Sequence, residues 1–235
     1  ILFQYLVVYS HSSDLLIFLK KHHRQLPLYQ MNKILNLEAV SSAAINSQPY
    51  PYFIVENSLS NEFVKEILGD FPQIHSGGSY ALADVDPGPR FNELLKELNS
   101  KAFRKIISSK LKIDLNDRPM IITLRGLSRA KDGRIHTDSK SKMATILLYF
   151  NESWQDENGC LRVLRSDNMD DFVNEVIPNA GAMIAFKVTD NCWHGYPAYE
   201  GSRQSIQINF VEDDKAATKH GKRHGWTAKI KKLFF

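Results

Sequence analysis

The hydrophobic pattern changes its period once along the chain, and this change restricts the fold more than any other sequence feature. Up to about residue 111 the apolar residues recur at helical spacing, whereas from residue 119 onward they form short β-rich runs bounded by Gly, Asn, Asp or Pro. The strands are expected at 119–125, 143–150, 160–164, 173–177, 182–187 and 204–212. Helices followed by many short strands predict a mainly β fold, a sandwich or jelly roll with supporting helices.

The first half of the chain predicts the supporting helices. A short helix is expected at 33–44, a first strand at 52–57, and a second helix after a capping segment at 58–62. Residues 72–90 carry three Pro and three Gly and predict a long loop, after which Phe91 to Leu111 has the spacing of one helix. We therefore expect N-terminal helices packed on one sheet of the β fold.

Composition narrows the class of protein. The 235 residues are 43% hydrophobic and 24% charged with a net charge of +4, which suits one globular domain with a real core. No apolar run reaches the roughly 18–20 residues that cross a bilayer, so no membrane partner is expected. Only two cysteines, Cys160 and Cys192, are present, which excludes a disulfide framework and favours a cytoplasmic location.

The chain divides into three expected segments. Residues 1–30 show no hydrophobic pattern that would add them to the β fold, and they lack the features of a secretory signal. Met31 is interpreted as the natural first residue. They are interpreted as an N-terminal extension, residues 31–214 as the domain, and residues 215–235 as a basic tail. His220 and His224 lie among basic residues of that tail and are interpreted as solvated. Because the basic run is confined there, a nucleic-acid partner is not expected.

The chemistry begins with a histidine followed two residues later by a carboxylate, His136-Thr137-Asp138. With eight histidines and 26 acidic residues in the chain, chance alone gives roughly one such pair, so the motif needs context. Gly133 places it at a loop before the strand 143–150, and His194 follows the strand 182–187. Two imidazoles and one carboxylate form a facial triad, which leaves three coordination positions open and suits non-heme Fe(II).

Arg203 lies nine residues beyond His194. Alternation along the strand puts Arg203, Ser205, Gln207 and Asn209 on one face, and no acidic residue shares that face. A buried arginine on an inner wall needs an anionic partner, and a ligand carboxylate would supply one through two parallel hydrogen bonds.

These motifs together resemble the 2-oxoglutarate/Fe(II) oxygenase superfamily, and most closely its prolyl-hydroxylase-like branch. Residues 149–154 resemble the Tyr-Leu-Asn-x-x-Trp segment of that branch, residues 159–163 its Gly-x-Leu-Arg-Ile segment, and residues 194–203 its iron-histidine segment. The resemblance covers about residues 50–212. It departs in the strand before the iron loop, where Arg125-Gly126-Leu127 stands roughly at the place of a Tyr of that branch.

The resemblance implies a fold and residue roles. The fold is a double-stranded β-helix (jelly roll). His136, Asp138 and His194 would bind Fe(II). Arg203 and Tyr149 would hold the distal carboxylate of 2-oxoglutarate, and Leu161 would line its methylene chain. Ser205 and Gln207 would face the same pocket, while Thr145 and Leu147 would wall it.

The implied activity is a dioxygenase that uses Fe(II), 2-oxoglutarate and O2, with an ascorbate requirement left open, to hydroxylate an unactivated C–H bond. A prolyl residue of a protein or peptide is one implied substrate. A hydroxylase of a small molecule or sugar chain would share the mechanism, and a cupin-like metal-binding module without turnover is the alternative from another class. The sequence does not define the substrate or the oligomeric state.

Overall fold

The computed structural model describes residues 33–218. The segment 1–30, His220, His224 and most of the tail 215–235 lie outside these residues. The segment boundaries expected at residues 30 and 214 therefore stay predictions.

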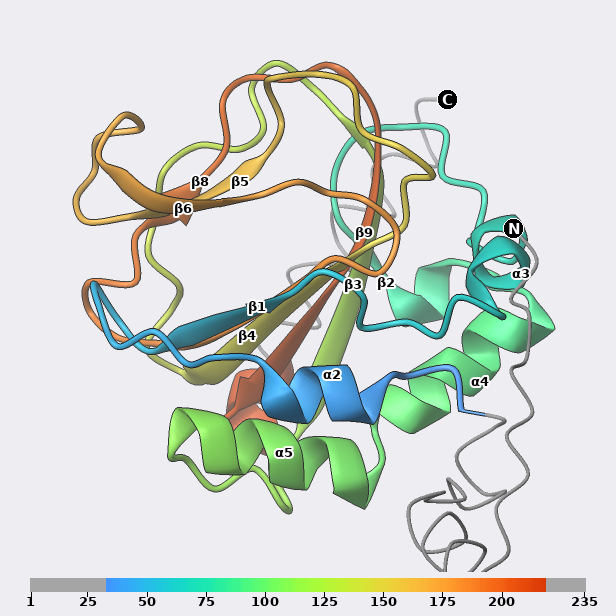
Figure 1. Cartoon of the computed structure of the whole chain (residues 1–235), viewed down its shortest axis with the longest axis horizontal. Helices are drawn as coiled ribbons and strands as arrows, with labels where there is room; N and C mark the ends of the chain where they lie inside the picture. Colours follow the sequence, from blue (N-terminus) through green and yellow to red (C-terminus); the bar gives the residue numbers. More distant parts are fainter. Residues whose placement is uncertain (1–32, 219–235) are drawn as a thin grey trace, which may run out of the picture. The chain divides into compact units, whose positions relative to one another are not determined.

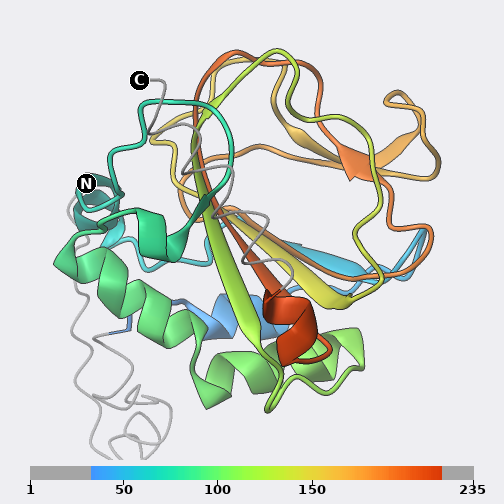
Figure 2. The ribbon, with the colours of Figure 1, turned by 180° about the vertical axis from the view of Figure 1, so that it is seen from behind.

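Two antiparallel sheets face each other (Figure 1). The larger sheet has the strand order β1-β7-β4-β9-β3-β2, and the smaller sheet has the order β6-β5-β8. Figure 2 shows β3 and β9 side by side from behind, as their antiparallel register requires. The strands are β1 (Tyr52–Val55), β2 (Tyr80–Ala81), β3 (Met120–Ser128), β4 (Lys142–Tyr149), β5 (Leu161–Leu164), β6 (Phe172–Val176), β7 (Met183–Lys187), β8 (His194–Gly195) and β9 (Gly201–Val211). This arrangement is the expected jelly roll with supporting helices.

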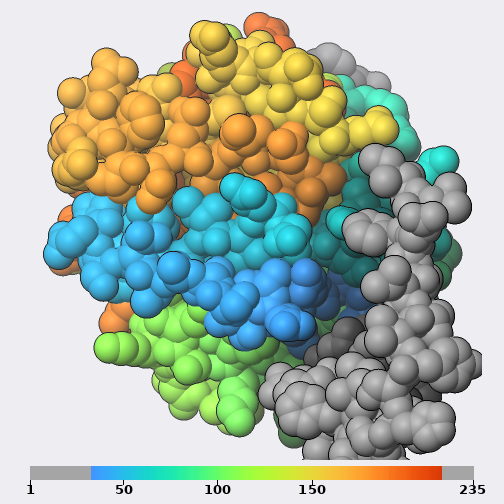
Figure 3. Space-filling view, viewed as in Figure 1, coloured from blue at the N-terminus to red at the C-terminus, as the bar shows by residue number. Residues whose placement is uncertain are grey.

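The helices cover the face of the larger sheet that points away from the smaller sheet (Figure 1). They are α2 (Leu37–Ser42), α3 (Val64–Gly69), the short 3-10 helix η2 (Leu82–Asp84), α4 (Pro89–Leu98) and α5 (Lys101–Leu111). Apolar residues of α4 and α5 pack with Ile146, Ile206 and Ile208 of the sheet in one buried cluster. Burial of each such side chain contributes about 1.5–3 kcal/mol relative to exposure. Figure 3 shows α2 and β1 as a band between α5 and the loops around β5 and β6.

Alternation along the strands separates the helix-covered core from the space between the sheets. On β4, Ala144, Ile146 and Leu148 join the helix-side cluster, whereas Tyr149 joins a second cluster between the sheets. On β9 the same period turns Arg203, Ser205 and Gln207 toward that inner space. The inner face of the larger sheet is therefore the face that carries polar side chains.

Two predicted elements differ in the structure, and one strand was not predicted. The helix expected from Phe91 to Leu111 is two helices. The first ends at Leu98 with Asn99 as its C-cap, and Ser100 caps the second by accepting a hydrogen bond from the Phe103 amide at 3.2 Å. The loop expected at 72–90 contains β2 and η2. The two-residue strand β8 is too short to give a hydrophobic period.

None of the helices described between residues 33 and 218 has the length and apolar character that a bilayer crossing needs.

Candidate metal centre and pocket

The backbone brings His136 and His194 together directly. The two residues form an isolated antiparallel bridge, in which the amide of each donates to the carbonyl of the other at 3.1 and 3.0 Å. Their ring centroids lie 4.3 Å apart. β8 carries His194 and also pairs with β5, so the smaller sheet fixes this histidine while the loop before β4 carries His136. Two backbone hydrogen bonds thus hold His136 and His194 side by side, although 58 positions separate them in the sequence.

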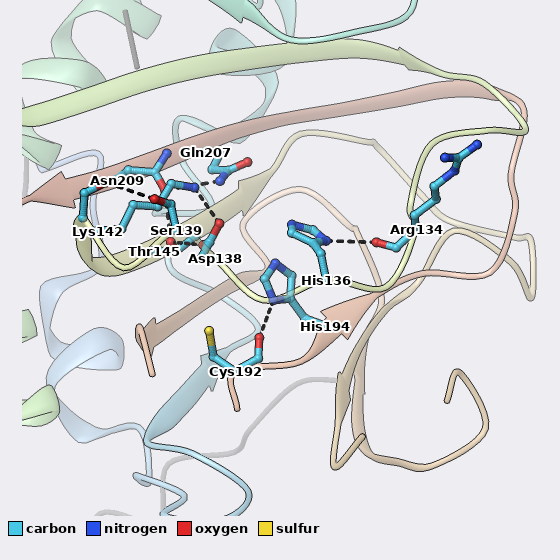
Figure 4. Close-up of polar contacts among 11 residues, drawn as sticks. Arg134, His136, Asp138, Ser139, Lys142, Thr145, Cys192, His194, Gln207 and Asn209 are labelled. Atoms are coloured by element: carbon cyan, nitrogen blue, oxygen red, sulfur yellow. Dashed lines mark hydrogen bonds and ion pairs between the residues drawn. The ribbon is translucent and has the colours of Figure 1, made fainter. Parts of the chain in front are cut away.

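Each imidazole has a hydrogen-bond partner at Nδ1 and, within the part of the chain that the structure describes, none at Nε2. Nδ1 of His136 lies 2.9 Å from the carbonyl oxygen of Arg134, and Nδ1 of His194 lies 2.8 Å from that of Cys192 (Figure 4). A carbonyl only accepts, so Nδ1 of each neutral ring carries the proton and Nε2 keeps its lone pair. Histidines that bind metals are typically oriented by such a hydrogen bond from their second nitrogen.

Asp138 is buried and held from two sides. Lys142 Nζ lies 2.6 Å from Oδ1, and the Thr145 hydroxyl donates to Oδ2 (Figure 4). Thr145 also lies 3.0 Å from Asn209 Oδ1. Burial alone would raise the pKa of Asp138, but Lys142, His194 and Thr145 together hold it below its usual value of 3.8. The carboxylate is therefore charged at neutral pH.

These three side chains have the geometry of a metal site. One ligand atom from each of His136, Asp138 and His194 lies within 4.8 Å of the other two. Two imidazole nitrogens and one carboxylate oxygen are a donor set that suits Fe(II) and leaves positions for further ligands. The free Nε2 atoms and the ionised carboxylate fit this metal. His136 is exposed while Asp138 and His194 are buried, so the site opens on the side of His136.

A pocket of about 260 Å³ extends from the two histidines into the inner space. Arg203 lies at its wall and is 4% exposed. Its Nε donates to the Gly159 carbonyl at 2.7 Å, and its guanidinium lies 3.9 Å from the Tyr196 ring centroid. Among the described residues it has no acidic partner within ion-pair distance. As the sequence predicts, Arg203 is buried on the inner wall, and no acidic residue of the described range pairs with it.

The other predicted pocket residues are close by. Tyr149 Oη accepts a long hydrogen bond, 3.5 Å, from Arg203. Burial raises the pKa of Tyr149 despite the opposing effect of Arg203, so its phenol stays protonated and can donate to a ligand. Leu147, Leu161, Ser205 and Gln207 also line the pocket.

Thr145 was expected to wall the pocket, and this prediction is wrong. Its side chain is completely buried and lies against Asp138 rather than along the cavity. Sequence reasoning also missed Lys142 and Tyr196. Lys142 stands four residues after Asp138, and Tyr196 two residues after His194, but neither spacing is specific. Cys192 is a buried core residue, as expected, whose carbonyl orients His194.

The support of Asp138 gives a first testable prediction. Thr145→Val keeps the side-chain shape but removes the hydroxyl that holds Oδ2. Loss of such a partner typically costs 10–100-fold in metal affinity, so we expect Fe(II) to bind about tenfold or more weakly. The measurement is anaerobic Fe(II) titration. Thr123→Val is the matched control, because Thr123 is buried on β3 and bonds none of the three ligands. Equal Fe(II) affinity of the Thr145 variant and the wild type would exclude this role.

The buried state of His194 gives a pH prediction for the metal-free protein. Burial lowers the pKa of His194 from 6.5 to about 4. As the pH falls from 6.5 toward 4, the unfolded chain takes up a proton that the folded chain does not, so stability falls. Between pH 7 and 5 the expected loss is about 2 kcal/mol. It is measured by urea unfolding of the wild type and of His194→Gln, which should lack this component. The same pH dependence in both proteins would contradict it.

Comparison with known proteins agrees with this site. Residues 126–211 match the family model described as the 2OG-Fe(II) oxygenase superfamily. This region contains the three ligands and Arg203. No curated protein matches the sequence.

Solved structures give distant similarities. A prolyl-4-hydroxylase from Pseudomonas putida is 18% identical with a TM-score of 0.49, over 75% of this chain and 89% of the other. A prolyl 4-hydroxylase from Phytophthora capsici is 13% identical with a TM-score of 0.47, over 68% and 58% of the two chains. The viral collagen prolyl hydroxylase of Paramecium Bursaria Chlorella virus-1, in a 2OG complex, is 14% identical with a TM-score of 0.44, over 68% and 96%.

The matched region includes His136, His194 and Arg203, which line one pocket, and Asp138, which lies beside the two histidines. Residues 126–211 of the chain are therefore similar to the 2OG-Fe(II) oxygenase superfamily.

Proposed function

We propose that this protein is a dioxygenase that binds Fe(II) through His136, Asp138 and His194 and hydroxylates a C–H bond of an organic substrate. The observation that carries the proposal is a three-ligand cluster opening onto a pocket with a buried arginine, beside which no acidic partner lies among residues 33–218. In such enzymes Fe(II), 2-oxoglutarate and O2 supply the oxidising chemistry, with succinate and CO2 as coproducts.

The position of each pocket residue suggests its role in binding. The Arg203 guanidinium and the protonated Tyr149 phenol offer donors to the distal carboxylate of 2-oxoglutarate, and Leu161 supplies an apolar wall for its methylene chain. Ser205 and Gln207 add polar groups on the same wall. Thr145 and Lys142 keep Asp138 ionised and fixed.

The proposed substrate is a prolyl residue of a protein or peptide. The motifs of residues 149–154, 159–163 and 194–203 support this substrate, and the solved structures named above are prolyl hydroxylases. A small molecule or sugar chain is the alternative for the same chemistry. A metal-binding module without turnover is less consistent with the structure, because such a module has no need for a buried arginine and tyrosine beside its metal.

The test is a turnover assay of the full chain with Fe(II), 2-oxoglutarate and O2, in which succinate is quantified with and without proline-containing peptides. We expect slow succinate release without peptide and a hydroxylated product when a suitable peptide is present. The assay is run with and without ascorbate to settle that requirement. No oxygen-dependent succinate under any of these conditions would mean that the protein is not an oxygenase.

A further inference from the structure

The pocket carries a second inward-facing cation that the proposed chemistry does not use. Arg125 lies on β3 and is paired in register with Ser205 of β9, in the same row of the sheet as Tyr149 of β4. Its side chain is partly buried and lines the pocket. Within residues 33–218 no ion pair or hydrogen bond satisfies its guanidinium. Burial of a charged guanidinium without an anion costs free energy, so the position of Arg125 points to an anionic ligand.

Two further cationic side chains lie between Arg125 and the mouth of the pocket. Lys131 and Arg134 lie on the exposed loop that leads from β3 to His136, and both line the pocket. Figure 4 shows the Arg134 side chain extending away from the histidines, with no interaction drawn to its guanidinium. Neither side chain has a polar partner among the residues that the structure describes. We call Arg125, Lys131 and Arg134 the cationic rim.

The charges around the rim do not cancel. Among the described residues that line the pocket, Asp132 is the one acidic residue, and it is already paired with Arg129, whose Nη2 lies 2.9 Å from Oδ1. The charge of Arg125 acts on Asp132 more weakly than that of Arg129 and forms no ion pair with it. Asp138 is paired with Lys142. If Fe(II) and the 2-oxoglutarate dianion bind, their charges balance each other, and Arg203 is used by the cosubstrate. The positive charge of the rim then remains for the substrate.

We propose that the cationic rim selects a polypeptide substrate with acidic side chains next to the hydroxylated residue. This inference rests on the proposed function and adds the chemical class of its substrate. The rim runs from a partly buried site on the sheet to exposed positions on the loop, so its charges are spread over several residues of an extended segment. A small acid with one carboxylate would occupy only one of these positions.

Electrostatic complementarity of this kind acts on specificity and on the rate of association, and salt weakens it. A peptide with acidic residues on both sides of a proline should therefore bind more tightly than its amide counterpart, and the preference should decline at high ionic strength. Removal of the rim charges should abolish the preference but leave cosubstrate binding intact.

The test uses the full chain, loaded anaerobically with Fe(II) and 2-oxoglutarate. Two fluorescent peptides are compared, Ala-Glu-Glu-Pro-Glu-Glu-Ala and the same sequence with Gln in place of Glu. Binding is followed by anisotropy at low and high salt. The variants are Arg125→Gln and the combined Arg125→Gln, Lys131→Gln and Arg134→Gln. Lys105→Gln, on the exposed face of α5 away from the pocket, is the matched control for a lost charge.

We expect the wild type and the Lys105 variant to bind the acidic peptide about tenfold or more tightly at low salt, and the triple variant to bind both peptides within about twofold of each other. Equal binding of the two peptides to the wild type would overturn the proposal. So would a hundredfold loss of 2-oxoglutarate affinity in Arg125→Gln, since Arg125 would then belong to the cosubstrate. Displacement of the acidic peptide by equimolar N-acetylglutamate would also overturn it, in favour of a small acid. Failure of the wild type to bind 2-oxoglutarate would instead remove the proposed function.

Discussion

His136→Ala is expected to abolish 2-oxoglutarate-dependent turnover and to remove tight Fe(II) binding, while the protein stays folded. His136 supplies one of three ligands, and two remaining ligands do not hold the metal in the required geometry. Its side chain is exposed and does not belong to either apolar cluster, so its removal leaves the core intact. Fe(II) binding is measured by anaerobic titration, and folding by circular dichroism and urea unfolding.

Replacement of Asp138 or His194 with Ala should remove tight Fe(II) binding as well, and it should also lower the free energy of unfolding. Asp138→Ala leaves the ammonium of Lys142 without its carboxylate in a pair whose side chains are only 12% and 4% exposed. Breaking such a buried pair costs on the order of 3 kcal/mol. His75→Ala is the control, because His75 is an exposed histidine outside the pocket lining. Unchanged Fe(II) affinity in two of the three ligand variants would mean that the metal, if bound, lies elsewhere.

Arg203→Ala is expected to weaken 2-oxoglutarate binding by about a hundredfold or more, while Fe(II) binding barely changes. Loss of the guanidinium leaves the ligand carboxylate buried without a charge partner, which costs roughly 3–5 kcal/mol. Each 1.4 kcal/mol is about tenfold in affinity. Arg203 is 4% exposed, so solvent screening reduces this effect little. Iron binding is insensitive because Arg203 is not among the ligand atoms.

Two conservative variants refine the test. Arg203→Lys should recover part of the affinity, since the charge remains but the planar fork is lost. Tyr149→Phe should cost less, about 1–2 kcal/mol, because one hydrogen bond to a charged group is lost and the ring stays. The measurement is 2-oxoglutarate titration of the anaerobic Fe(II) protein, with Arg165→Ala on the exposed β5–β6 turn as control. Wild-type affinity in Arg203→Ala would place the carboxylate clamp elsewhere.

Much of the fold could be predicted from the helical and strand periods of the hydrophobic pattern, and much of the site from the motif His136-Thr137-Asp138. The alternation on β9 predicted that Arg203, Ser205 and Gln207 face the pocket, and the sequence named His136, Asp138 and His194 as the candidate metal ligands, which the structure brings together. The strand β8 could not be predicted, since two residues show no period. The break between α4 and α5 was hidden because Leu98 and Phe103 are both buried on either side of it.

The contacts around the three candidate ligands could not be predicted from the sequence, for another reason. Lys142 pairs with Asp138 four residues earlier, a spacing that predicts no contact outside a helix. Tyr196 packs on Arg203 across the fold. In the sequence Arg125 was noted only as part of Arg125-Gly126-Leu127, a departure from the family pattern. Its place on the pocket wall beside Ser205 depends on the register between β3 and β9, which the sequence does not define.

The most direct test of the central claim is the metal-to-ligand absorption band of the anaerobic protein titrated with 2-oxoglutarate in the presence of Fe(II). This band requires iron and cosubstrate to be bound to each other in one site. The site described here predicts that the band appears and saturates at one Fe(II) and one 2-oxoglutarate per chain, and that it is absent in His136→Ala. A folded wild-type protein that binds Fe(II) but shows no band at saturating 2-oxoglutarate would contradict the account.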